Sequence, residues 1–218
     1  MKIPDRIRSL FDRYEIPRAP VVFFRDTVYS LTSEVEDLPH TFGGRMPSCL
    51  GIGSPAFHRL VLTLNTDFLS AMSSQESRLP SVLPLIFNFD LGGLTTDYVI
   101  EGTTLRFAHR LCIFGPWKPG PDSQLPYEPY PDFFPEVKMG LGISARLEFQ
   151  TFQRLFTPQG LSGSSERPDI ADHLFVIVPP CKDFRISMWG EDGDSEGVLC
   201  IFDYDLSTGK VDVTNQCT

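Results

Sequence analysis

Residues 137–149 alternate without interruption between apolar side chains and polar or small ones. The apolar positions are Val137, Met139, Leu141, Ile143, Ala145, Leu147 and Phe149. A period of two places these residues on one face of a β-strand, whereas an α-helix would scatter them around its axis. The run therefore predicts a half-buried strand, or a bent pair of strands, with a bulge at Gly140 or Gly142.

Proline and glycine divide the rest of the chain into short segments, which favours strands over long helices. The sequence holds 19 prolines and 17 glycines in 218 residues. Apolar runs predict strands at 21–24, 60–64, 83–90 and 174–178, and those at 21–24 and 174–178 are expected to be buried. One apolar stripe predicts a short helix over residues 4–15, formed by Ile7, Leu10, Phe11 and Tyr14. We therefore expect a β-rich single domain that spans residues 1–218 and contains a few short helices.

Two segments predict β-hairpins. In the first, the sequences DYVI and TTLRF flank Glu101-Gly102, and the glycine suits a tight turn. In the second, the apolar run 198–204 is followed by a turn at 206–209 and a returning strand at 210–213. The pair Gly43-Gly44 also indicates tight backbone geometry.

The C-terminal hairpin and the turn before it carry most of the surplus charge. Residues 191–212 hold seven acids and one lysine, hence six of the chain's nine surplus negative charges. A net charge of −9 and a pI near 4.9 argue against binding to nucleic acid or to an anionic membrane, because both need clustered Lys and Arg. A basic protein partner fits better, although the charge also serves solubility.

The acidic turn has a partial calcium-loop pattern. Asp192, Asp194 and Glu196 occupy positions 1, 3 and 5 of such a loop, Gly197 position 6 and Asp203 position 12. Position 12 is normally a bidentate glutamate, and a strand rather than a helix is predicted to follow. We favour a solvated turn over a metal site, and we expect no cofactor.

No motif identifies a catalytic centre. The five cysteines lack a CxxC pair, which fits free thiols in the cytoplasm better than disulfides or zinc. The four histidines lie outside any HExxH or GxSxG motif. Two glycine patterns, at 51–56 and 140–145, lack the strand–turn–helix context that a dinucleotide needs. The start of the chain lacks a signal-peptide core, and no apolar run is long enough to span a bilayer.

Residues 115–135 combine seven prolines with several aromatic side chains, which predicts a long irregular or polyproline loop. Trp117, Tyr127 and Tyr130 are candidates for partner contacts, unless they fold back onto the core. The same loop suggests an alternative function. In that alternative, a small-molecule or hydrolytic pocket lies beneath it, with His109 as a general base.

The order of several short motifs resembles the YwqG-like family of bacterial proteins. The matching motifs are Phe42-Gly43-Gly44 with Pro47, Leu79-Pro80, Phe134-Pro135-Glu136-Val137, Met188-Trp189-Gly190-Glu191 and Asp205-Leu206. Glu191 departs from the expected aspartate, and residues 124–130 and 159–169 have no counterpart. The resemblance implies a compact α+β domain with curved antiparallel sheets and no established enzymatic activity. It also implies a link to toxin and immunity systems, in which an acidic protein covers a basic toxin.

These patterns and the resemblance together predict a non-enzymatic cytoplasmic interaction module, of immunity type, that binds a basic protein partner. An aromatic anchor surrounded by charges is typical of a binding surface. The predicted contact residues on the acidic hairpin are Trp189, Glu191, Asp192, Asp194 and Glu196. No catalytic, cofactor-binding or metal-binding residue is predicted.

Overall fold

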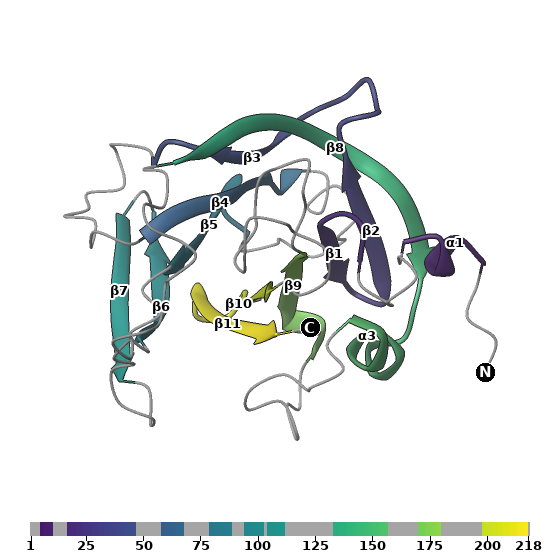
Figure 1. Ribbon diagram of the computed structural model, residues 1–218. Helices are drawn as coiled ribbons and strands as arrows, with labels where there is room; N and C mark the ends of the chain where they lie inside the picture. The colour runs from purple at the N-terminus through teal and green to yellow at the C-terminus, as the bar shows by residue number, and fades with distance from the viewer. Residues whose placement is uncertain are drawn as a thin grey trace, which may run out of the picture.

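A curled sheet of 11 antiparallel strands makes up most of the computed structural model (Figure 1). The structure describes residues 5–10, 17–46, 58–67, 79–88, 94–102, 104–111, 133–156, 170–179 and 198–217. In the order of the sheet, the strands are β5 (Val82–Asn88), β4 (His58–Asn65), β3 (His40–Gly44), β8 (Phe134–Arg146), β2 (Thr27–Thr32), β1 (Val21–Phe24), β9 (His173–Val178), β10 (Val198–Asp205), β11 (Lys210–Cys217), β6 (Leu94–Glu101) and β7 (Thr104–Leu111).

The expected α+β class is wrong, because strands dominate the described residues and helix is confined to short pieces. These pieces are α1 (Asp5–Arg8), α3 (Phe149–Phe156) and the 3-10 turn Ile170–Asp172. Both α1 and α3 lie on the outer side of the curled sheet and form no helical layer across it (Figure 1). Of the helix predicted over residues 4–15, the structure describes α1; residues 11–16 lie outside the described part. The sheet buries its own apolar face by curling, so a helical layer is not needed to cover that face.

Two cores lie on opposite faces of the sheet. The larger core fills the concave side and takes side chains from all 11 strands, among them Phe42 and Phe202. The smaller core lies on the outer side, where Phe152 of α3 stacks on Phe23 of β1 with ring centroids 4.3 Å apart. Strands β1, β9 and β10 contribute to both cores. Burial on both faces explains why their sequences are continuous apolar runs rather than alternating ones.

The strand predicted from residues 137–149 is confirmed as β8, although it ends at Arg146 and α3 follows. Its pairing with β2 is irregular. Tyr29 pairs with Ser144, but Leu31 pairs with Leu141, so β8 has one more residue than β2 over this interval. This is a β-bulge, and it includes one of the two glycines at which a bulge was predicted.

The bulge around Gly142 moves the apolar alternation of β8 from one face of the sheet to the other. Before the bulge, Val137 and Leu141 pack against the inner core. After it, Ala145 and Leu147 belong to the outer core. An insertion of one residue reverses the facing of every later side chain, so one unbroken period-two sequence serves two cores.

Glycine marks the turns as predicted. Gly43 and Gly44 have φ values of 66° and 88°, which confirms the tight geometry expected of this pair. The hairpin of β6 and β7 is confirmed, but its turn lies one residue later than predicted. Glu101 pairs with Thr104, so the connection consists of Gly102 and residue 103.

The curl brings β5, at one end of the sheet, against β6, near the other end. The two strands are not neighbours in the strand order, and the hydroxyl of Tyr98 joins them. This hydroxyl donates to the carbonyl oxygen of Pro84 at 2.8 Å and accepts from the amide of Ile86 at 3.1 Å. Tyr98 is fully buried, so the contact fixes the β6–β7 hairpin from within the core.

Candidate functional site

The partner-contact residues predicted from the sequence lie outside the residues that the structure describes. They are Trp189, Glu191, Asp192, Asp194, Glu196, Trp117, Tyr127 and Tyr130. The alternative pocket beneath residues 115–135 falls outside the described part for the same reason. For His109, the structure describes the backbone in β7 but not the side chain.

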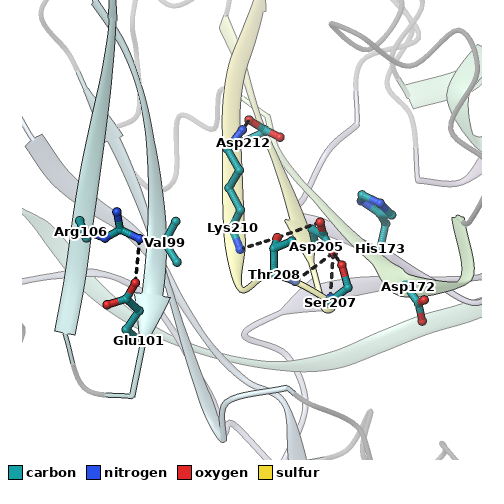
Figure 2. Close-up of a pocket in the computed structure, with 10 residues that line it drawn as sticks. All are labelled: Val99, Glu101, Arg106, Asp172, His173, Asp205, Ser207, Thr208, Lys210 and Asp212. Atoms are coloured by element: carbon teal, nitrogen blue, oxygen red, sulfur yellow. Dashed lines mark hydrogen bonds and ion pairs between the residues drawn. The ribbon is translucent and has the colours of Figure 1, made fainter.

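A cavity of about 670 Å³ opens where the turn of the β6–β7 hairpin, the start of β9 and the turn of the β10–β11 hairpin meet (Figure 2). We call it the hairpin-end pocket. Its charged wall residues are Glu101, Arg106, Asp172, Asp205, Lys210 and Asp212. Its remaining lining residues are Val99, His173, Ser207 and Thr208.

Strand register explains why these polar side chains meet. His173 of β9 lies directly opposite Asp205 of β10, and Asp205 lies opposite Lys210 of β11. Residues directly opposite each other in an antiparallel sheet share one face. That face is the outer one, because the adjacent residues Tyr204 and Val211 belong to the inner core.

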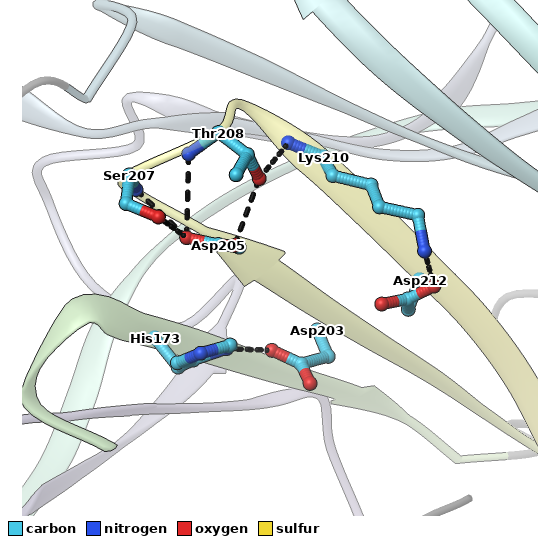
Figure 3. A network of polar contacts seen from close by, with 7 residues as sticks. All are labelled: His173, Asp203, Asp205, Ser207, Thr208, Lys210 and Asp212. Carbon is cyan, nitrogen blue, oxygen red and sulfur yellow. Dashed lines mark hydrogen bonds and ion pairs between the residues drawn. The ribbon is translucent and has the colours of Figure 1, made fainter. Parts of the chain in front are cut away.

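His173 and Asp203 form a short polar contact at the pocket wall, with 2.7 Å between Nδ1 and Oδ1 (Figure 3). An ionised carboxylate can only accept, so Nδ1 carries the proton in this pair. The two side chains are 15% and 9% exposed, which keeps the contact largely away from solvent. The ring of Phe175 stacks on the imidazole at a centroid distance of 6.0 Å. Together these contacts fix the orientation of the His173 ring.

Asp205 shapes the turn between β10 and β11. Its carboxylate accepts hydrogen bonds from the amide of Ser207 at 2.8 Å, the hydroxyl of Ser207 at 2.6 Å and the hydroxyl of Thr208 at 2.8 Å (Figure 3). Burial by itself raises the pKa of Asp205. The hydrogen bonds and the nearby His173 outweigh that effect and leave the pKa below its ordinary value. Asp205 is therefore a fixed negative charge at the pocket.

Lys210 lies between two carboxylates. Its Nζ is 3.6 Å from Oδ2 of Asp97 and forms an ion pair with Asp212. The side chain of Asp97 is only 3% exposed, and its Oδ1 accepts a hydrogen bond from the amide of Val213 at 3.2 Å. Burial and the neighbouring carboxylate of Asp212 raise the pKa of Asp97 above its ordinary value, against the lowering effect of the amide and of Lys210.

Of the candidate ligands in the calcium-loop pattern, the structure describes Asp203, whereas Asp192, Asp194 and Glu196 lie outside the described part. Asp203, which would supply position 12, is bound to His173 within the extended strand β10. The preference for a solvated turn over a metal site stays a prediction. Within the described ranges, His, Cys, Asp and Glu residues form no group of three or more that could hold a metal ion.

Two other histidines belong to the core. His40 is fully buried, and its Nδ1 accepts a hydrogen bond from the amide of Asn65 at 3.1 Å. Burial lowers the pKa of His40 to about 4, so its ring is neutral at physiological pH. His58 packs edge-on against Phe107 at 4.8 Å. Both positions agree with the structural role that we expected for scattered histidines.

The sequence contains a partial signal for the hairpin-end pocket. Asp203 and Asp205 alternate with buried apolar residues along β10, and Lys210 and Asp212 do so along β11. Such alternation marks a polar outer face on each strand. His173 lies 30 positions from Asp203 in the sequence, and only the pairing of β9 with β10 brings the two together.

No family model, curated protein or solved structure matches this chain. The resemblance to the YwqG-like family therefore stays a prediction. No helix in the part of the chain that the structure describes is long and apolar enough to cross a membrane.

Proposed function

We propose that this protein is an interaction module that binds a basic protein partner through its C-terminal hairpin. The observation that carries the proposal is the charge around the hairpin-end pocket. Four carboxylates (Glu101, Asp172, Asp205 and Asp212) and two cations (Arg106 and Lys210) line the cavity, which leaves a surplus of two negative charges when His173 is neutral. A surplus of this sign in a concave site attracts cationic groups and disfavours anionic ones.

Several of these charges are held in place by contacts within the protein. Asp205 is fixed by Ser207 and Thr208, and Asp212 is fixed by its ion pair with Lys210. A site that is already ordered loses less side-chain entropy on binding than a mobile one. This order supports a recognition role for the pocket, because the partner's cation meets a negative field that needs no rearrangement.

Strand β10 connects the pocket to the predicted acidic contact residues. The strand starts at Val198, directly after the acidic turn, and ends at Asp205, which lines the pocket. Eight residues of strand place these two ends about 23 Å apart. In this proposal the pocket receives one basic side chain of the partner, while Trp189 and the acids of residues 191–196 contact another part of it. An immunity-type role in the cytoplasm belongs to the same proposal.

Calorimetric titration with hexalysine tests the proposal, with hexaglutamate as the probe of opposite charge. We expect hexalysine alone to bind, and we expect binding to weaken between about 50 and about 300 mM salt, because salt screens exposed charges. Asp172→Asn and Asp205→Asn are each expected to weaken binding several-fold, whereas Lys138→Gln on the distant strand β8 should leave it unchanged. Equal binding of both peptides, or binding that ignores salt, would refute the proposal.

A second variant separates the two parts of the proposed surface. Replacing Asp192, Asp194 and Glu196 together by serine removes three negative charges from the acidic turn and leaves the residues of the hairpin-end pocket unchanged. If both regions contribute, this variant and Asp205→Asn weaken binding independently, and their effects on the binding free energy add. If the triple variant binds like the wild type, the acidic turn is not part of the contact surface.

A further inference from the structure

We propose that pH controls partner binding at the hairpin-end pocket through His173, whose protonation halves the surplus negative charge of the site. This inference rests on the proposed function, because it concerns the regulation of the same pocket. With a neutral imidazole, the four carboxylates exceed the two cations by two. With an imidazolium, the excess is one, so a cationic side chain meets a weaker attraction.

His173 is held in the pocket wall by backbone pairing and by side-chain contacts. It is the first residue of β9, and its backbone is paired with that of Asp205 on β10. Its ring is held by the 2.7 Å contact with Asp203 (Figure 3) and by stacking on Phe175. Protonation therefore adds a charge at a fixed position beside the ligand rather than at the end of a mobile side chain.

The charged groups around His173 come from every element that forms the pocket. The carboxylates of Asp203 and Asp205 lie on β10, and Asp172 precedes His173 in the chain. Across the cavity, β11 supplies Lys210 and Asp212, and the β6–β7 hairpin supplies Glu101 and Arg106 (Figure 2). Asp205 stays ionised between about pH 5.5 and about pH 9, because its hydrogen bonds hold its pKa low.

Histidine is the side chain whose charge ordinarily changes between about pH 5 and about pH 8. His173 is the histidine among the residues that line the pocket, so it is the lining residue expected to change charge in this pH range. Asp97 lies next to Lys210, and its raised pKa brings its titration closer to neutral pH. The effect of Asp97 on binding must therefore be distinguished from that of His173. An Asp97→Asn variant removes that titration and leaves His173 in place.

The affinity for hexalysine, measured by calorimetry from about pH 5.5 to about pH 9, tests the inference. In the wild type we expect binding to be about tenfold weaker at the acidic end, as one unit charge near a partly solvated ligand would produce. His173→Gln should bind at all pH values with the affinity that the wild type shows at high pH. Asp97→Asn and the distant Lys138→Gln should keep the wild-type dependence.

Asp203→Asn provides an independent variant, because Asp203 contacts His173 and is not one of the residues that line the cavity. Loss of this carboxylate removes a partner of the imidazolium, so the midpoint of the pH dependence should move to lower pH. A midpoint that stays in place in Asp203→Asn overturns the inference. This test remains valid even when His173→Gln does not fold. Melting curves of each variant establish whether it is folded.

The outcomes distinguish the inference from the proposed function. A wild-type affinity that does not vary with pH, or a His173→Gln variant with the wild-type pH dependence, overturns the inference and leaves the proposed function standing. Failure of hexalysine to bind at any pH overturns the proposed function, and the inference with it.

Discussion

The carboxylate of Asp97 on β6 accepts a hydrogen bond from the backbone amide of Val213 on β11, at 3.2 Å. The backbones of these two strands pair at two positions, Lys210 with Val99 and Val211 with Tyr98. The buried side chain of Asp97 therefore extends the contact between β6 and β11 beyond their short run of backbone pairs. The junction between the two hairpins that form the pocket depends on a titratable group.

Asp97→Asn should change how stability depends on pH. The folded state raises the pKa of Asp97 above its ordinary value of 3.8, so folding favours the protonated form. The stabilisation that this proton gives the wild type is complete below about pH 4 and is lost as pH rises through the folded pKa. Asparagine does not ionise. The variant should therefore gain stability relative to the wild type as pH rises, by about 1.4 kcal/mol for each tenfold difference in proton affinity between the two states.

Urea unfolding of both proteins between about pH 4 and about pH 8 measures this difference. Asp97→Leu serves as the comparison, since leucine cannot accept the bond from Val213. Relative to Asp97→Asn, it should destabilise the fold by about 1–3 kcal/mol across the whole range, because a buried amide loses its acceptor. A constant difference between Asp97→Asn and the wild type would show that Asp97 does not titrate differently on folding.

Tyr98→Phe should weaken the contact between β5 and β6. The variant keeps the ring but leaves the amide of Ile86 and the carbonyl oxygen of Pro84 without the hydroxyl. Loss of a buried hydrogen-bond partner costs about 1–3 kcal/mol in the free energy of unfolding. Faster amide hydrogen exchange at Ile86 than in the wild type would confirm that the loss is local to this contact. Unchanged exchange would mean that another group satisfies this amide.

The turn between β1 and β2 should tolerate substitution with a gain in stability. Arg25 and Asp26 have φ values of 47° and 57°, in the left-handed region that costs non-glycine residues about 1–2 kcal/mol. Two-residue hairpin turns with this geometry favour Asn-Gly. We expect Arg25→Asn with Asp26→Gly to raise the free energy of unfolding by about 0.5–1 kcal/mol, less than the strain relieved, because glycine also gains freedom in the unfolded chain. A lower melting temperature would contradict this reading of the turn.

Gly43→Ala and Gly102→Ala form a matched pair. Their φ values are 66° and 62°, so an alanine meets the same backbone strain at both positions. The added Cβ would overlap the carbonyl oxygen of Pro135 at position 43, whereas nothing lies within 4 Å at position 102. Gly102→Ala should therefore cost about 1 kcal/mol and Gly43→Ala at least about 2 kcal/mol more. Equal melting temperatures would show that the strand around Pro135 shifts at no cost.

The sequence predicts the separate strands better than their assembly. The alternation at residues 137–149, the glycines at 43 and 102 and the C-terminal hairpin all carry local signals, because side-chain period and left-handed turns depend on neighbouring residues. The predicted α+β class is wrong because fold class depends on how distant elements pack together, which local sequence patterns do not record. Helix α3, with eight residues, covers only the outer core.

The sequence by itself determines that this chain is acidic, rich in short strands and polar on alternate positions of its last two strands. Tertiary structure alone decides which of these polar positions become a site. His173 meets Asp203 because β1, β9 and β10 pair in register, and Lys210 meets Asp97 because β11 pairs with β6 across a long sequence separation. Hydrogen bonding between strands joins residues that are distant in the chain, and no local pattern records those partners.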